Sequence, residues 1–194
     1  MSSIILPDSA LPNPDMSPVT IFAAPYSEDA RQSHELLRRA ATIHTGGDPG
    51  IIAVGPCGKP FFQDNGALHF SISHSGDYWL CAFSAQPVGI DLQRCRSFVP
   101  PETLSRRFFH PREDAFLSQN CYIRFYDLWT AKESWVKFTG RGFYDEPETF
   151  SVVAEDGGFP VVEGAQMRHI PFREGYSLCV CCEDLDEIIF RDMT

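Results

Sequence analysis

The chain has 194 residues, of which 43% are hydrophobic and 22% are charged, and its 26 Asp and Glu outnumber its 16 Lys and Arg. This length suits one large domain or two small lobes, and an aromatic content of 13% supplies enough bulky side chains for a core, which excludes a mainly disordered chain. Apolar runs such as 79–83 are far shorter than the roughly 18 residues of a membrane span, so no membrane partner is expected. The net charge of −10 argues against nucleic-acid binding.

Residues 1–19 are rich in Pro and Ser without periodicity, which predicts a flexible lead-in. No Lys or Arg precedes Arg31, so the basic start of a signal peptide is missing and a cytoplasmic protein is expected. The seven cysteines are an odd number, and several lie in apolar runs. We interpret them as reduced, buried thiols.

The first half of the chain combines one helical pattern with several strand patterns. A capping Ser27, acids after it and arginines further on predict a helix to about Ile43, closed near Gly46. Short segments rich in β-branched and aromatic residues follow, separated by turn-forming residues. They predict strands over 51–54, 68–73, 78–84 and 88–93.

The second half repeats this order. A helical region follows Pro101, Pro111 marks the start of another helix, and a long helix is predicted over 125–139, ending at Gly140. Strands are predicted over 150–153, 158–162 and 176–182. Helix followed by strands thus occurs twice, which predicts an α+β fold of two comparable lobes meeting near residue 90. The predicted domains are a lead-in over 1–19, an N-terminal lobe over 20–90 and a C-terminal lobe over 91–194.

The strand over 88–93 carries a candidate metal ligand. Strand alternation places Gly89, Asp91 and Gln93 on one face. A carboxylate there is costly to bury unless it meets a cation or several donors, and Mg²⁺ is the natural oxygen-seeking partner. The alternative is an ion pair between Asp91 and a nearby arginine, which this segment alone favours.

The long helix carries a charged face. Helical spacing places Glu133 and Lys137 on one side as an i,i+4 pair, with Lys132 adjacent. A surface salt bridge of ~0.3–0.5 kcal/mol explains this pair. However, the chain has three lysines beside thirteen arginines, and two of the three lie here. Lysine is a compact point charge, which suits a phosphate site.

His74 lies where a strand gives way to a Ser-Gly-Asp turn, exposed enough to meet a ligand phosphate together with the Ser73 hydroxyl. A turn-stabilising histidine explains the position equally well. The segment lacks both the pattern and the setting of a serine hydrolase elbow.

Basic residues are concentrated in the middle of the chain. Residues 94–141 hold nine basic and five acidic residues, whereas residues 142–194 hold three basic and twelve acidic ones. This distribution indicates either a local site for an anionic partner or substrate, or a solvated helical face.

Five motifs follow one another along roughly residues 27–182. They are Gly58-Lys59-Pro60, Ser71-Ile72-Ser73-His74-Ser75-Gly76, Val88-Gly89-Ile90-Asp91, Arg107-Phe108-Phe109 with Glu113, and Trp129-x-x-Lys132-Glu133-Ser134-x-x-Lys137-x-x-Gly140-x-Gly142. Together they resemble the 4′-phosphopantetheinyl transferases of the two-lobed, surfactin-synthetase-activating type. Each motif alone is a weak signal, and their combination is specific.

The resemblance implies two similar lobes in a pseudo-twofold arrangement with the active site between them. It also implies transfer of the 4′-phosphopantetheine arm of coenzyme A, as substrate, to a serine of an acyl- or peptidyl-carrier protein, with release of adenosine 3′,5′-bisphosphate. Such chemistry depends mainly on positioning and charge neutralisation. We expect a monomer whose partner is an acidic carrier protein.

The resemblance also assigns roles to individual residues. Asp91 and Glu133 bind Mg²⁺, with Gln93 in a third ligand position. Lys137 neutralises the pyrophosphate, with Lys132 close by, and Glu113 or Glu133 takes the serine proton. The nucleotide and its 3′-phosphate are gripped by Lys59, Ser73 and His74.

Two features depart from the family pattern. Gln93 stands where the family usually has a third acid, which predicts weaker metal binding or a water in that position. The basic run that often precedes the first helix is missing from residues 21–27. Two alternatives therefore remain: a non-catalytic homologue that binds coenzyme A or a carrier protein, and a magnesium-dependent hydrolase of nucleotide pyrophosphates.

The basic middle then suggests a docking surface. Arginines there can steer an acidic carrier, and neighbouring phenylalanines can add an apolar contact or belong to the core. The arginines are Arg94, Arg96, Arg106, Arg107 and Arg112, and the phenylalanines are Phe108, Phe109 and Phe116. For at least two of the three phenylalanines, we expect the core.

Overall fold

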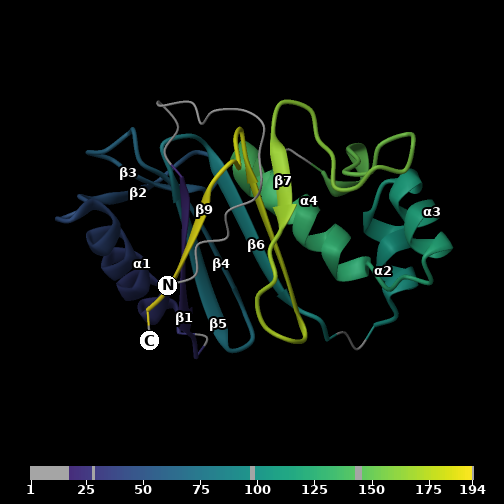
Figure 1. Cartoon of the computed structure of the whole chain (residues 1–194), viewed down its shortest axis with the longest axis horizontal. Helices are drawn as coiled ribbons and strands as arrows, with labels where there is room; N and C mark the ends of the chain where they lie inside the picture. The colour runs from purple at the N-terminus through teal and green to yellow at the C-terminus, as the bar shows by residue number, and fades with distance from the viewer. Residues whose placement is uncertain (1–17, 28, 97–98, 143–145, 194) are drawn as a thin grey trace.

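The computed structural model describes residues 18–27, 29–96, 99–142 and 146–193 (Figure 1). Helices and β-sheets are both present, so the predicted α+β class is confirmed. The strands are β1 (Val19–Pro25), β2 (Ile52–Val54), β3 (Pro60–Phe62), β4 (His69–Ser75), β5 (Tyr78–Ser84), β6 (Val88–Arg94), β7 (Gln166–His169), β8 (Tyr176–Cys182) and β9 (Ile188–Asp192). The helices are α1 (Ala30–Thr45), α2 (Pro101–Phe108), α3 (Pro111–Gln119), α4 (Phe125–Thr139) and the short 3₁₀ helix η2 (Pro147–Thr149).

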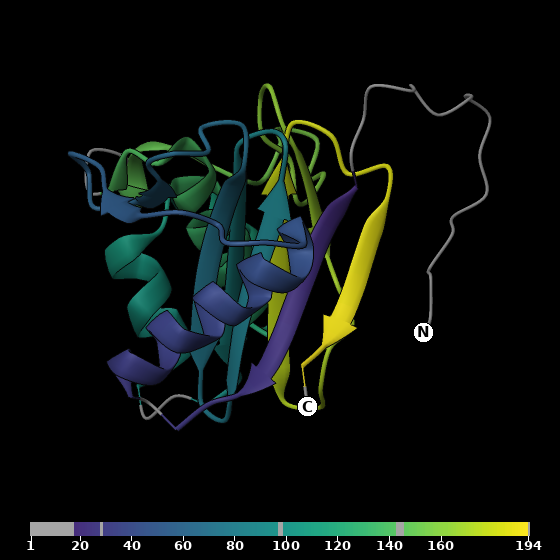
Figure 2. The ribbon, with the colours of Figure 1, turned by 90° about the vertical axis from the view of Figure 1, so that its left-hand side faces the viewer.

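The first sheet has the strand order β4-β5-β1-β9, and α1 covers one of its faces (Figure 2). Strand β1 is antiparallel to β5 and parallel to β9, so the C-terminal strand returns to the start of the chain. The N-cap of α1 is Asp29, whose carboxylate accepts the Arg31 N–H at 2.8 Å, and not Ser27 as predicted. Gly46 closes the helix with a φ of 75°, a left-handed conformation that glycine adopts without strain.

The second sheet has the order β6-β8-β7, and both of its strand pairs are antiparallel. Its register places Asp91 opposite Cys179 and Gln93 opposite Ser177. Helix α4 packs against β6 and β8, while α2 and α3 lie at the far end of the molecule from α1 (Figure 1).

The two sheets meet where β4 runs beside β6. Side-chain hydroxyls of β4 accept backbone N–H groups of β6 at every second residue. The pairs are Ile90 with Ser71 at 3.1 Å, Leu92 with Ser73 at 3.0 Å and Arg94 with Ser75 at 3.0 Å. This serine ladder couples the sheets without a backbone-to-backbone ladder.

Three apolar clusters hold these layers together. One lies between the two sheets and contains Ile21, Leu80 and Ile90. A second lies between the first sheet and α1, around Trp79, and a third joins α3 and α4 to the second sheet, around Leu128. All five of these side chains are fully buried. The elements that carry the polar site are therefore fixed by close packing.

The structure corrects part of the predicted element order. Residues 150–153 and 158–162 are not strands. Side chains satisfy backbone groups there, since Lys132 donates to the Phe150 carbonyl and Glu113 accepts the Val152 N–H. Strands β1, β3, β7 and β9 were not predicted.

The predicted domain boundaries differ from the sheet pattern. The boundary at residue 90 falls inside β6, and β9 pairs with β1 in the first sheet. The two-lobe division remains a prediction. Residues 1–17 of the predicted lead-in lie outside the described residues, and Val19 is already the buried first residue of β1.

The cysteines are all free, but they are not all buried as predicted. Cys95 and Cys121 are exposed and Cys57 is half-buried, whereas the other four lie in the core. Across the described ranges, no helix is long and apolar enough to span a membrane.

Candidate active site

The Asp91 carboxylate is the centre of the polar cluster between β4, β6 and α4. It is 2% exposed, because strand alternation turns it toward α4. Its Oδ1 accepts the Lys137 ammonium at 2.6 Å and the Ser73 hydroxyl at 2.9 Å. Its Oδ2 accepts the Gln93 amide at 3.2 Å. The buried charge is thus compensated by one cation and two neutral donors, and the cation is a lysine and not the arginine considered above.

Helix α4 reaches this carboxylate because Gly89 has no side chain. A Cβ at residue 89 would overlap the Ser134 carbonyl oxygen and lie 2.5 Å from Phe138 N. The backbone of α4 therefore lies directly on β6. Gly89 and Asp91 of the Val88-Gly89-Ile90-Asp91 motif serve one purpose, since the glycine admits the helix that carries the partners of the aspartate.

Glu133 lies one turn before Lys137 on α4 and is half-buried. Burial raises the pKa of its carboxyl, and the negative charge of Asp91 raises it further, while Lys137 and Lys132 act in the opposite direction. The negative charge of Asp91 that raises this pKa also attracts a cation to the same place.

These residues fit a magnesium site. Mg²⁺ is usually held in proteins by one or two carboxylates, with waters and substrate phosphates completing its shell. Asp91 and Glu133 would supply two hard oxygen ligands to such an ion, and the Gln93 amide lies beside Asp91. Within the described part of the chain, no group of three or more His, Cys, Asp and Glu forms a metal site by itself.

Replacing Gln93 by Glu is expected to lower the magnesium concentration needed for half-maximal activity. The amide of Gln93 already contacts Asp91, so a carboxylate in its place adds a charge at the same point. Calorimetric titration with Mg²⁺ measures the same effect without turnover. An unchanged metal requirement, with the variant still folded, contradicts a position of residue 93 beside the ion.

Lys59 lies at the end of α4 nearest the first sheet. Its ammonium donates to the carbonyls of Lys137 at 2.5 Å, Val88 at 3.1 Å and Phe138 at 3.4 Å. Two of these carbonyls belong to the last turn of α4, where backbone acceptors lack helical partners. Burial lowers the pKa of Lys59 to about 8. The residue therefore joins the loop before β3 to both β6 and α4.

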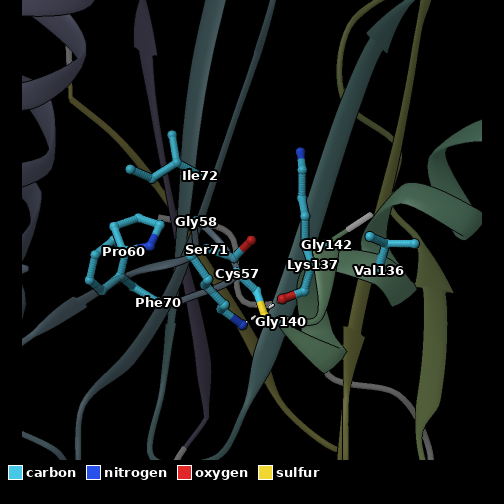
Figure 3. A pocket seen from close by; sticks show the side chains of 11 residues that line it. Cys57, Gly58, Pro60, Phe70, Ser71, Ile72, Val136, Lys137, Gly140 and Gly142 are labelled. Carbon is cyan, nitrogen blue, oxygen red and sulfur yellow. Dashed lines mark hydrogen bonds between the residues drawn. The ribbon is translucent and has the colours of Figure 1, made fainter. Parts of the chain in front are cut away.

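A cavity of about 240 Å³ opens beside Lys59 and Lys137. In Figure 3, Pro60, Phe70 and Ile72 lie on one side of it, and Lys137 and Val136 of α4 lie on the other. The lining of the cavity is mainly apolar, since the Lys59 ammonium is engaged with backbone carbonyls and the Lys137 ammonium with Asp91 and Ser73. Such a lining suits an apolar part of a ligand.

Ser73 and His74 are not brought together as the sequence suggested. The Ser73 side chain is buried and contacts Asp91 and Lys137, whereas His74 is exposed. Because they are adjacent in β4, they face opposite sides of the strand. The His74 ring packs against Tyr26, with 4.7 Å between the ring centroids.

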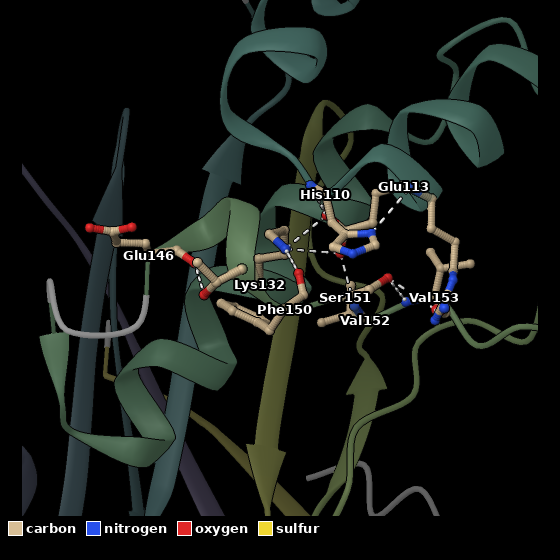
Figure 4. A network of polar contacts seen from close by, with 10 residues as sticks. His110, Glu113, Lys132, Glu146, Phe150, Ser151, Val152 and Val153 are labelled. Carbon is tan, nitrogen blue, oxygen red and sulfur yellow. Dashed lines mark hydrogen bonds and ion pairs between the residues drawn. The ribbon is translucent and has the colours of Figure 1, made fainter.

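Glu113 and Lys132 form a separate buried pair (Figure 4). Their side chains are 0% and 3% exposed, with 2.8 Å between Nζ and Oε2. Glu113 also accepts the backbone N–H groups of Val152 at 2.8 Å and His110 at 3.0 Å. The Glu113 carboxylate thus has three donor groups and no exposed surface, so it fixes the loop after η2 to α3 and α4.

Comparison with known proteins shows the family of this chain. Residues 87–181 match the family model of the 4′-phosphopantetheinyl transferase superfamily. A 4′-phosphopantetheinyl transferase of Bacillus subtilis is 34% identical over 180 residues, which cover 83% of this chain and 78% of the relative. The chain belongs to the 4′-phosphopantetheinyl transferase superfamily.

Further relatives place it near the surfactin-synthetase-activating type. The transferase Sfp of Bacillus subtilis strain 168 is 33% identical over 154 residues, 70% of this chain and 67% of the relative. The transferase gsp of Aneurinibacillus migulanus is 34% identical over 137 residues, 64% of this chain and 54% of the relative. The enzyme class expected from the sequence is confirmed, and enzymes of this superfamily use coenzyme A as substrate.

Four of the five arginines of the predicted docking surface of this transferase divide into two groups. Arg94 pairs with Asp77 at 3.4 Å, and Arg112 pairs with Glu155 at 3.3 Å. Arg106 and Arg107 are exposed on α2, and the Arg107 guanidinium lies over the ring of Phe108 at 5.0 Å.

The phenylalanines follow the expectation for two of the three. Phe108 is 37% exposed, whereas Phe109 is buried and Phe116 packs against the same third cluster. The exposed part of α2 therefore combines positive charge with one aromatic ring.

Sequence reasoning missed some residues of the transferase site. Cys57 lines the cavity, and Tyr26 holds His74. No periodicity or motif pointed to either residue. The alternation of Ser71, Ser73 and Ser75 was a usable signal, because three hydroxyls on one face of a strand favour a polar contact on that face.

Proposed function

We propose that this transferase moves the 4′-phosphopantetheine arm of coenzyme A to a serine hydroxyl of a carrier protein, releasing adenosine 3′,5′-bisphosphate. The observation that supports it most directly is the buried Asp91 carboxylate. Lys137 is paired to it, Glu133 lies beside it, and a cavity opens next to them. Because this reaction cleaves a pyrophosphate, its site must concentrate positive charge and exclude water.

Asp91 and Glu133 are proposed to hold Mg²⁺, with Gln93 as a neutral third neighbour. The ion, when bound, supplies charge neutralisation at the pyrophosphate. Lys137 contributes a second positive charge on the same side, since its ammonium already lies 2.6 Å from Asp91. Asp91 therefore orients Lys137 as well as binding metal.

The cavity is proposed to take part of the coenzyme. Pro60, Phe70 and Ile72 supply apolar surface, and Lys59 borders the same space. His74 is exposed and remains the candidate for a phosphate contact. Lys132 is excluded from such a contact by its buried pair with Glu113.

Glu133 is proposed as the group that accepts the serine proton, directly or through water. Burial and the charge of Asp91 raise its pKa when no metal ion is bound, and a positioned carboxylate is a common general base. Glu113 is the weaker candidate, because all of its contacts are with donors of the protein itself.

The basic surface of α2 is proposed to recruit an acidic carrier protein. Arg106 and Arg107 are exposed there beside Phe108, and charge complementarity acts mainly on the rate of encounter. We further propose that the protein acts as a monomer in the cytoplasm, where coenzyme A is available, without nucleic acid or membrane as partner.

Reversing Arg106 and Arg107 to Glu is expected to raise the Michaelis constant for carrier and to leave that for coenzyme A nearly unchanged. Higher salt should weaken carrier use more in the wild type than in the variant. The reason is that the Debye length falls from about 10 Å at 0.1 M to roughly 3 Å at 1 M salt. Steady-state kinetics with each substrate varied measures both effects.

A matched control reverses Arg39 and Arg191, which are exposed on α1 and β9, by the same change in charge. It should leave both Michaelis constants unchanged. If the two constants shift together and the melting temperature falls, the α2 arginines stabilise the protein itself and the docking proposal is wrong.

The function is tested by incubating the protein with coenzyme A, Mg²⁺ and an apo carrier protein and then weighing the carrier. A mass increase of one phosphopantetheine on serine supports transfer. No change, with coenzyme A bound, supports the binding homologue. Cleavage of coenzyme A without any carrier supports the pyrophosphate hydrolase.

A further inference from the structure

The serine ladder of β4 contains one member with additional contacts. Ser71, Ser73 and Ser75 each accept a backbone N–H of β6 at 3.0 or 3.1 Å. Among the described residues of the ladder, Ser73 alone has two further charged partners. Its hydroxyl donates to Asp91 Oδ1 at 2.9 Å and accepts from Lys137 Nζ at 3.1 Å.

These contacts use the full capacity of the Ser73 hydroxyl. A serine side chain has one hydrogen to donate and two lone pairs to accept with. Asp91 takes the hydrogen, and the Leu92 N–H and the Lys137 ammonium take the lone pairs. The residue is also 5% exposed. The hydroxyl therefore has no unused hydrogen-bonding position and almost no accessible surface for a phosphate.

We propose that Ser73 is a positioning residue, which holds Asp91 and Lys137 in the arrangement needed for metal and pyrophosphate, and that it is not a ligand of the nucleotide. This inference rests on the proposed function. Its physical basis is that hydrogen bonds from neighbouring groups orient the carboxylates that bind metal ions. The Leu92 N–H of β6 holds the Ser73 hydroxyl in place. Because the Lys137 ammonium donates to the same hydroxyl, Ser73 also fixes the position of that ammonium along β6.

The test compares Ser73→Ala with Ser75→Ala. Both variants lose one acceptor of the serine ladder, but Ser75→Ala leaves the Asp91 and Lys137 contacts intact. Calorimetric titration with Mg²⁺ in the presence of coenzyme A should show affinity about 10- to 100-fold weaker in Ser73→Ala, the usual effect of removing a hydrogen-bond partner of a metal ligand. Ser75→Ala should match the wild type.

Two further measurements separate positioning from loss of folding or of a phosphate contact. Ser73→Thr keeps the hydroxyl and should recover most of the metal affinity. In transfer assays, kcat of Ser73→Ala should fall by the same factor with coenzyme A and with 3′-dephospho-coenzyme A, because the defect does not involve the 3′-phosphate. Melting curves show whether each variant is folded.

Several results overturn the inference. Equal Mg²⁺ affinity in Ser73→Ala and Ser75→Ala removes its basis, as does a wild type that binds no Mg²⁺. A Ser73→Ala defect that disappears with 3′-dephospho-coenzyme A makes Ser73 a phosphate ligand. Failure of the proposed function is a different outcome, since it shows as a wild type that binds Mg²⁺ and leaves the carrier unmodified.

Discussion

Alanine in place of Asp91 or Glu133 is expected to abolish transfer while the protein still folds. Both carboxylates lie where α4 meets β6, and Asp91 also orients Lys137 through a 2.6 Å ion pair. Under the proposed function, removing either acid takes away a ligand of Mg²⁺ and part of the charge arrangement that would surround the pyrophosphate. Loss of a single preorganised electrostatic group commonly costs about 10²- to 10³-fold in rate. The measurement is the rate of carrier modification at saturating coenzyme A.

Two controls make this result specific. Glu174→Ala removes an exposed acid that is distant in sequence from both Asp91 and Glu133, and this variant should retain full activity. Asp91→Asn keeps the volume of the side chain, so its melting curve separates loss of charge from loss of packing. Full activity in either alanine variant, or in the wild type with excess chelator, is incompatible with metal held by these two acids.

Gly89→Ala is expected to prevent the native packing of α4 on β6. The added Cβ would lie 2.5 Å from Phe138 N and would overlap the Ser134 carbonyl oxygen, and neither backbone group can move without the helix. Overpacking of a tight core costs about 3 kcal/mol or more in cases of this severity. Denaturant unfolding followed by circular dichroism measures the loss, and transfer should disappear because Glu133 and Lys137 move with α4.

Gly66→Ala is the matched control, because Gly66 is exposed and a Cβ there meets no atom within 4 Å. It should change the free energy of unfolding by less than about 0.5 kcal/mol. A Gly89→Ala protein as stable as Gly66→Ala would show that α4 does not approach β6 as closely as described.

Local sequence signals predicted the elements that depend on their own residues. Helix α4 ends at Gly140 as expected, and β5 and β8 have the predicted bounds. These segments carry their period and their end signals within a few residues. Strand β9 was missed because its partner, β1, lies at the opposite end of the chain.

The site was predictable in composition but not in its contacts. Asp91 and Lys137 form an ion pair, and Glu133 is close enough for both charges to act on its pKa, as the motif order suggested. That Ser73 faces Asp91 while its neighbour His74 faces Tyr26 depends on how β4 lies beside β6, which no local pattern specifies.

Glu113 and Lys132 show the same limit. Their residue types suit catalysis, but both side chains are buried in an ion pair with each other, which gives them a structural role. Complete burial is a property of the packed elements around them, which no single segment of the sequence determines.

The serine ladder between β4 and β6 has a consequence for how the protein avoids unwanted association. A strand whose N–H groups are unpaired is a template for another chain to add to the sheet. The hydroxyls of β4 occupy the N–H groups of β6 at residues 90, 92 and 94, so this side of the second sheet offers no free donors at those positions. The serine ladder thus closes this side of the second sheet to a foreign β-strand at those positions, although no backbone ladder joins the two sheets there.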